Sequence, residues 1–135
     1  VNMIAMSRGF DTPYFVVFDA DTNCKKEDEK ENRKRNSKIS MLMELNIKDA
    51  EWPSGDIFND RVIIWKDNIQ ASIANEYSAW YDDVKGLCTA FGWEYDRLKK
   101  NPVVLLSALE AAIAKKAKLD CLDHAAKQIM KFASA

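Results

Sequence analysis

The sequence predicts an α/β fold, with a parallel β-sheet and a helical C-terminal part. Residues 14–18 and 62–65 form short apolar runs that are rich in β-branched and aromatic residues. Such runs are typical of the buried strands of a parallel sheet. Polar residues follow each run, and a segment with helical spacing of its apolar residues comes next. This alternation of strand and helix is the third observation that predicts the α/β class.

The chain of 135 residues is long enough for one domain with its own hydrophobic core. We expect an α/β part over about residues 1–75 and a helical part over about residues 76–135. The formal net charge of -1 excludes a strongly basic nucleic-acid binder, so any attraction to phosphate must be local. Three separated cysteines without a Cys-X-X-Cys motif indicate neither a zinc site nor a disulfide framework, which predicts a reducing cytoplasm. No apolar run reaches the length of a membrane span, and the start at Val1 suggests a fragment of a longer chain.

The remaining elements follow from apolar spacing and from turn-forming residues. In chain order we expect a helix that ends near residue 9, strands at 13–18 and 61–65, and helices at 30–45, 69–77, 78–91, 103–116 and 120–133. Residues 46–60 are expected to connect two elements without forming one. We expect the first strand to lie in the centre of the sheet, and Leu106, Ile113, Ile129 and Met130 to pack on the apolar faces of the last two helices.

Two carboxylates, Asp19 and Asp21, follow the first strand, and Asp67 follows the second. The carboxyl ends of parallel strands meet at the edge of a sheet where ligands bind, and carboxylates there suit a hard cation such as Mg²⁺. An Asp-X-Asp after a strand also serves to cap a helix or to make an Asx turn. The motif alone leaves both interpretations open.

A basic cluster lies in the polar segment after the first strand and consists of Arg33, Lys34, Arg35 and Lys38. A solvated helical face explains it, and so does contact with a phosphate backbone. The only histidine, His124, is expected to be structural, because its predicted helix carries no other candidate ligand or nucleophile.

The string from Tyr14 to Asp21, the polar segment after it and the later strand-helix unit resemble the Toprim domain. More narrowly, they resemble the Toprim domain at the C-terminal end of the OLD (overcoming lysogenization defect) family of ATP-dependent endonucleases. The turn at residues 100–102 before an Ala/Leu helix adds to this resemblance, which covers most of residues 10–115. It implies a Toprim-like (Rossmann-like) sheet, truncated on its N-terminal side, in a DNA endonuclease that uses Mg²⁺ or Mn²⁺. It further implies an N-terminal ABC-type ATPase domain in the full-length chain, a homo-oligomer, and a role in phage defence or DNA processing.

The resemblance also assigns roles to single residues. Asp19 and Asp21 match the family's Asp-X-Asp and would bind the metal, and Lys100, with Lys99 as the fallback, would contact the scissile phosphate. The basic cluster and Lys99 would contact DNA.

The sequence departs from the family pattern at two positions. Gln70 stands where a glutamate is expected, so Asp67 would have to supply that carboxylate, and the glutamate after the family's first strand has no counterpart. If that glutamate lies upstream of Val1, the full-length enzyme could be active and this chain alone inactive.

Two other functions fit the same residues. A catalytically degenerate Toprim module could dock DNA or mediate dimerisation, as Gln70 and the missing glutamate suggest. A phosphotransfer or phosphohydrolase domain could use Asp19 as a nucleophile, although no matching Ser/Thr and Lys positions are found at the strand ends.

Overall fold

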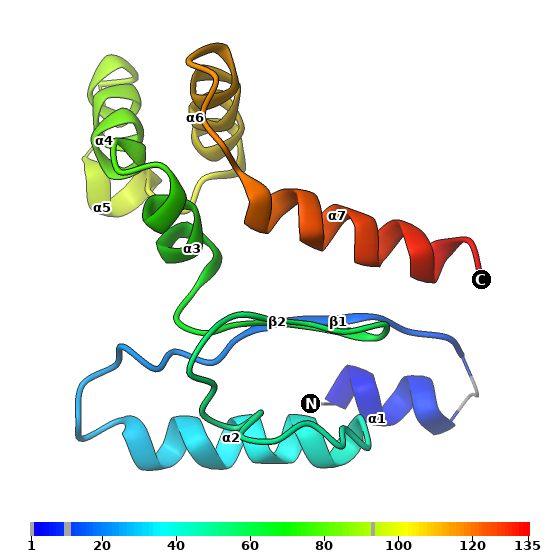
Figure 1. Ribbon diagram of the computed structural model, residues 1–135. Helices are drawn as coiled ribbons and strands as arrows, with labels where there is room; N and C mark the ends of the chain where they lie inside the picture. Colours follow the sequence, from blue (N-terminus) through cyan, green and yellow to red (C-terminus); the bar gives the residue numbers. More distant parts are fainter. Residues whose placement is uncertain (1, 10–11, 93) are drawn as a thin grey trace. The chain divides into compact units, whose positions relative to one another are not determined.

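The computed structural model describes residues 2–9, 12–92 and 94–135, and it has the mixed α/β character that the sequence predicts (Figure 1). Its described elements are α1 (Asn2–Gly9), β1 (Val16–Asp19), α2 (Glu29–Leu42), β2 (Ile57–Phe58), β3 (Val62–Trp65), α3 (Ile69–Glu76), α4 (Trp80–Ala90), α5 (Tyr95–Leu98), α6 (Pro102–Ala114) and α7 (Asp120–Ala133). The chain forms two compact units. The first unit comprises Val1–Ser72 and Asp123–Ala135, and the second comprises Ile73–Leu122. Within the described ranges, no helix has both the length and the apolarity that crossing a membrane requires.

The sheet of the first unit has the strand order β1-β3-β2. β1 and β3 pair in parallel, with Val16 opposite Val62 and Asp19 opposite Trp65, which confirms the predicted parallel pairing. β2 pairs antiparallel with β3 and lies inside the connection in which we expected no element, so that expectation is wrong. β2 is only two residues long, and so short a strand leaves no periodicity for a sequence pattern to detect.

The prediction that β1 lies in the centre of the sheet is also wrong. β3 is central and buried along its whole length, whereas β1 has one neighbour among the described strands and Val17 remains 49% exposed. An apolar run indicates that a strand contributes to a core, but it does not show how many strands flank that strand.

One face of the sheet packs on α1 and α2, and the other face lies against α7 (Figure 1). The first face forms a core in which Val62 and Ile64 of β3 meet Ile39 and Met43 of the α2 region. On the second face, contacts between aromatic side chains connect the sheet with α7. The pairs are Phe15 with Phe132 at 5.4 Å and Phe58 with His124 at 5.5 Å, measured between ring centroids.

The second unit is helical, and α4 packs against α6. Lys115, just after α6, donates to both carboxylate oxygens of Asp83 on α4 at 2.8 Å, and Tyr77 donates its hydroxyl to the same carboxylate at 2.7 Å. Each helix buries residues four positions apart, and small side chains on α6 allow close approach. These residues are Trp80, Val84 and Cys88 on α4 and Val104, Ala108 and Ala112 on α6.

Four apolar residues that we expected to be packed are exposed. Leu106 and Ile113 on α6 are 58% and 65% exposed, and Ile129 and Met130 on α7 are 43% and 71% exposed. In α6 the mostly apolar sequence allows more than one choice of buried face, and the structure buries the face with the smaller residues, Val104, Ala108 and Ala112.

Candidate functional site

The carboxyl ends of β1 and β3 lie side by side and continue to hydrogen-bond beyond the strands. The amide of Ala20 donates to the carbonyl of Trp65 at 2.8 Å, and the amide of Asp21 donates to the carbonyl of Asp67 at 3.1 Å. The amide of Thr22 then donates to the carbonyl of Lys66 at 3.1 Å. The segment after β1 therefore runs along the segment after β3, and the predicted acidic residues share one end of the sheet.

The side chains of Asp19 and Asp21 point in different directions. Asp19 ends β1 and is exposed, and by strand alternation it projects from the face opposite to Phe18, which packs into the core. Asp21 has a φ of 53°, a left-handed conformation that aspartate tolerates better than most residues. The Oδ2 atom of Asp21 accepts a hydrogen bond from Nη2 of Arg35 at 2.8 Å.

Arg35 of α2 lies next to the Asp-X-Asp segment. Besides Asp21, its Nη2 reaches the carbonyl oxygen of Asp19 at 3.3 Å. The pair of Arg35 and Asp21 is partly open to solvent, with side chains 44% and 38% exposed. An ion pair this exposed contributes little to stability and can open without a large cost.

Asp67 and its neighbours form the second half of the candidate site. The Thr22 hydroxyl donates to Oδ1 of Asp67 at 2.6 Å. Oδ1 of Asn68 accepts from the amide of Ala71 at 3.0 Å, so Asn68 caps the start of α3 with its side chain. Gln70, which replaces the expected glutamate, lies half-buried in the first turn of that helix.

Asn36 is a residue of this site that the sequence analysis did not single out. It is fully buried on α2, and its Nδ2 donates to the carbonyl oxygens of Ala20 at 2.9 Å and of Glu51 at 3.1 Å. It therefore ties α2 and residue 51 to the residue between the two aspartates. A signal was present, because Asn36 precedes the buried residues Ile39 and Met43 by three and seven positions and so shares their helical face.

The basic cluster does not form one surface. Arg33 pairs with Glu29 at 2.9 Å and lies 4.3 Å from the ring centroid of Trp52, while Arg35 points to Asp21. Lys34 and Lys38 are exposed and make no ion pair with any residue that the structure describes. They lie about 160–200° around the helix from Asn36, so they face away from the core.

Lys99 and Lys100 belong to the second unit, whereas Asp19, Asp21 and Asp67 belong to the first. Lys99 donates to a carboxylate oxygen of Asp96, and this contact raises the pKa of Lys99 above its ordinary value. The start of the helix after Lys100 agrees with the prediction. Asn101 accepts from the amide of Val103 at 2.9 Å, and Pro102 stands in the first turn of α6.

The fit of this site to a divalent metal ion is incomplete. Its carboxylate and carbonyl oxygens are the ligand types that Mg²⁺ prefers. However, no three His, Cys, Asp or Glu side chains are grouped to hold a metal ion anywhere in the described residues. Asp21 would also have to exchange Arg35 for the metal. The ligand types therefore fit Mg²⁺, but their present arrangement does not form a closed coordination set.

Comparison with known proteins found no match among protein-family models, curated protein sequences or solved structures. The arrangement of these side chains is therefore the basis for an inference about function.

Proposed function

We propose that this chain is a Toprim-like domain of an OLD-type nuclease and that it takes part in Mg²⁺- or Mn²⁺-dependent cleavage of DNA. The observation that carries the proposal is the parallel pairing of β1 and β3, which brings Asp19, Asp21 and Asp67 to the same end of the sheet. Ligands bind at this end of the strands in open α/β sheets.

In this proposal, each residue near the strand ends has its own role. Asp19 and Asp21 would hold the metal together with water and a phosphate oxygen of the substrate, and Asp67 would hold Thr22 in place or add a further carboxylate. A bound divalent ion supplies a water with a lowered pKa and a positive charge at the phosphate oxygens. Arg35 would release Asp21 and pair with a phosphate, since guanidinium groups bind phosphate in a bidentate manner.

Lys100, or Lys99 in its place, would contact the scissile phosphate in this proposal. Lys34 and Lys38 on the outer side of α2 would contact the DNA backbone further from the metal. The same proposal includes an N-terminal ABC-type ATPase domain in the full-length chain and assembly of the chain into a homo-oligomer.

The test is nicking of supercoiled DNA by the full-length protein with Mg²⁺ or Mn²⁺, because the glutamate that this chain lacks could lie in the full-length protein. We expect metal-dependent nicking, and we expect Asp19→Asn and Asp21→Asn to reduce the rate by at least about a hundredfold, because each removes a charged metal ligand. Asp123→Asn, a change at an exposed aspartate on α7, is the matched control and should cleave like the unaltered chain. Metal-dependent nicking that persists in both site variants would disprove the assignment, as would its complete absence in the unaltered full-length protein.

A second candidate, a module that binds DNA without cleaving it, is favoured by two observations. The described residues contain no group of three metal-ligating side chains, and Asp21 is already paired with Arg35. Binding of labelled DNA, measured by fluorescence anisotropy over a range of salt concentrations, tests this candidate. Replacement of both Lys34 and Lys38 by Gln should reduce the salt dependence of the affinity by up to about two counterions. Unchanged salt dependence would contradict DNA contact through α2.

A further inference from the structure

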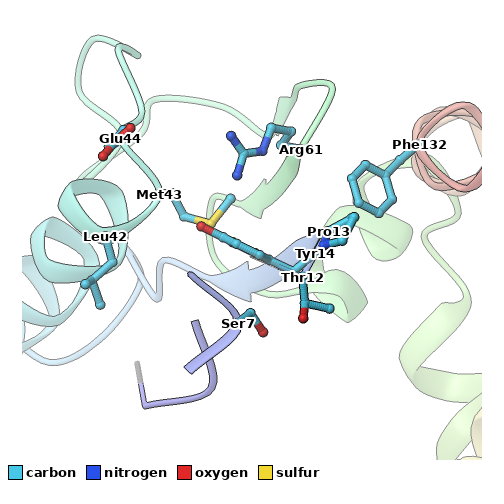
Figure 2. A pocket seen from close by; sticks show the side chains of 9 residues that line it. All are labelled: Ser7, Thr12, Pro13, Tyr14, Leu42, Met43, Glu44, Arg61 and Phe132. Atoms are coloured by element: carbon cyan, nitrogen blue, oxygen red, sulfur yellow. The ribbon is translucent and has the colours of Figure 1, made fainter. Parts of the chain in front are cut away.

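A pocket lies at the opposite end of the sheet from the aspartates, within the first unit. It has a volume of about 470 Å³. Tyr14 and Arg61, which precede β1 and β3 respectively, line it from the amino ends of the parallel strands. Figure 2 shows the side chains that surround it, which come from α1, the segment before β1, the end of α2, the segment before β3 and the end of α7. They are Ser7, Thr12, Pro13, Tyr14, Leu42, Met43, Glu44, Arg61 and Phe132.

Arg61 supplies a positive charge to this pocket. Its guanidinium carbon lies 5.2 Å from the centroid of the Tyr14 ring, so a cation–π contact holds it. Arg61 makes no ion pair with any other side chain that the structure describes, in contrast to Arg33 and Arg35. Its hydrogen-bond donors therefore remain available to a carboxylate or phosphate.

The rest of the lining combines apolar and polar side chains. Pro13, Leu42 and Phe132 offer hydrocarbon surface, and Met43 closes the base with only 3% of its surface exposed. The hydroxyls of Ser7 and Thr12 line the same space, and their segments are joined by a hydrogen bond from the Thr12 amide to the Ser7 carbonyl at 2.9 Å. A volume of a few hundred cubic ångströms is in the range of small-molecule sites, and this lining offers a ligand both a positive charge and hydrocarbon surface.

Glu44 limits where a negative charge can sit. Glu44 belongs to the lining, and its carboxylate gives that side of the pocket acceptor oxygens rather than donors for an anion. A ligand with one anionic group would place that group at Arg61 and its apolar part against Phe132 and Pro13.

We propose that this pocket binds a small molecule that carries one carboxylate or phosphate group on an apolar ring. The site is separate from the carboxylates after β1 and β3, so the proposal does not depend on nuclease activity. A nicking assay and a binding assay can therefore fail independently of each other.

The test follows the methyl resonance of Met43 by NMR while the full 135-residue chain is titrated with four probes. Benzoate and phenyl phosphate carry an anionic group on a ring, benzyl alcohol has the ring alone, and inorganic phosphate has the charge alone. We expect a saturable shift with at least one of the ring anions at millimolar concentration, and at least about tenfold weaker binding of benzyl alcohol and of inorganic phosphate. The stronger of the two ring anions identifies the ligand as a carboxylate or a phosphate ester.

A pair of variants assigns the binding to Arg61. Arg61→Gln should lower the affinity for the ring anion by at least about tenfold. Arg97→Gln, which alters an exposed arginine of the second unit, should leave the affinity unchanged. Equal binding of benzyl alcohol and the ring anions, unchanged affinity in Arg61→Gln, or no saturable shift with either ring anion would overturn the proposal. Because the benzyl alcohol comparison uses the unaltered chain, it holds even if Arg61→Gln disturbs the fold.

Discussion

Replacement of Asn36 by alanine tests how the Asp-X-Asp segment is held in place. Asn36 is fully buried, and its side-chain amide donates to the carbonyl oxygens of Ala20 and Glu51 at 2.9 and 3.1 Å. The variant loses both hydrogen bonds and leaves the carbonyl of Ala20 without this donor in a site that water does not reach easily. The lost bonds cost roughly 1 kcal/mol each and the buried carbonyl roughly 1–2 kcal/mol, while removal of the Asn36 Oδ1 atom, which is buried without a hydrogen-bond partner, recovers roughly 1 kcal/mol. We therefore expect a loss of roughly 2–3 kcal/mol in the free energy of unfolding.

Urea denaturation followed by circular dichroism measures this loss. Ser37→Ala, a change at the exposed neighbour on the same helix, is the control and should alter the free energy by no more than about 0.5 kcal/mol. The amide of Asp21, which donates to Asp67, should also exchange its hydrogen faster in Asn36→Ala, because Ala20 is its neighbour in the chain. A destabilisation that does not exceed that of the control, or unchanged exchange at Asp21, would refute the role assigned to Asn36.

Three further predictions concern the second unit. Gly86→Ala should stabilise the protein by about 0.5–1 kcal/mol, because Gly86 lies inside α4 and no atom lies near an added Cβ. Gly92→Ala should instead destabilise the protein by about 1 kcal/mol, because Gly92 has a φ of 71°. Urea midpoints of the two variants measure this contrast, and a shift in the same direction for both would contradict it. Asp83→Asn should lower the urea midpoint at neutral pH, because hydrogen bonds from Lys115 and Tyr77 hold the pKa of Asp83 below its ordinary value. The stabilisation from a carboxyl with a lowered pKa is present above its unfolded pKa of about 3.9 and disappears as the pH falls through the folded value. The difference between the variant and the unaltered chain should therefore begin to shrink at about pH 4 and decrease further at lower pH. A difference that stays constant into acid would exclude this linkage. The amide of Cys121, near the start of α7, donates to both carboxylate oxygens of Glu76 at 3.0 and 3.1 Å. Glu76→Ala should therefore lower the free energy of unfolding by about 1 kcal/mol and speed hydrogen exchange at the Cys121 amide. Glu110→Ala, at an exposed position on α6, should leave the exchange of that amide unchanged.

Local pattern in the sequence was enough to find the two parallel strands and most helices. β-branched and aromatic runs bounded by turn residues identified Val16–Asp19 and Val62–Trp65. Pro102 identified the start of α6, because the fixed φ of proline suits the first helical turn, and the structure adds the side-chain cap of Asn101. The same local reasoning placed Asp19, Asp21 and Asp67 after strands, and the parallel pairing then brought them to one end of the sheet.

The contacts of the candidate site depended on residues far apart in the chain. Nothing in the local pattern distinguishes Arg35, which pairs with Asp21, from Lys34 and Lys38, which face away from the core. A position on a helix decides which way a side chain points, but only the packing of α2 on the sheet decides what it meets. The ion pair therefore qualifies the predicted metal site, because the same carboxylate that would bind the metal already has a partner.

The sequence by itself determined the α/β class, the two parallel strands and the acidic residues that follow them, because these depend on the spacing of neighbouring residues. Only the tertiary structure decided that β3, rather than β1, is central, and that α7 contacts the second face of the sheet through Phe132 and His124. It also formed the pocket around Arg61, whose lining comes from segments as distant as Ser7 and Phe132. These features depend on which elements pack against one another. The hydrophobic pattern of a single helix or strand shows which of its faces is buried, but not which element buries it.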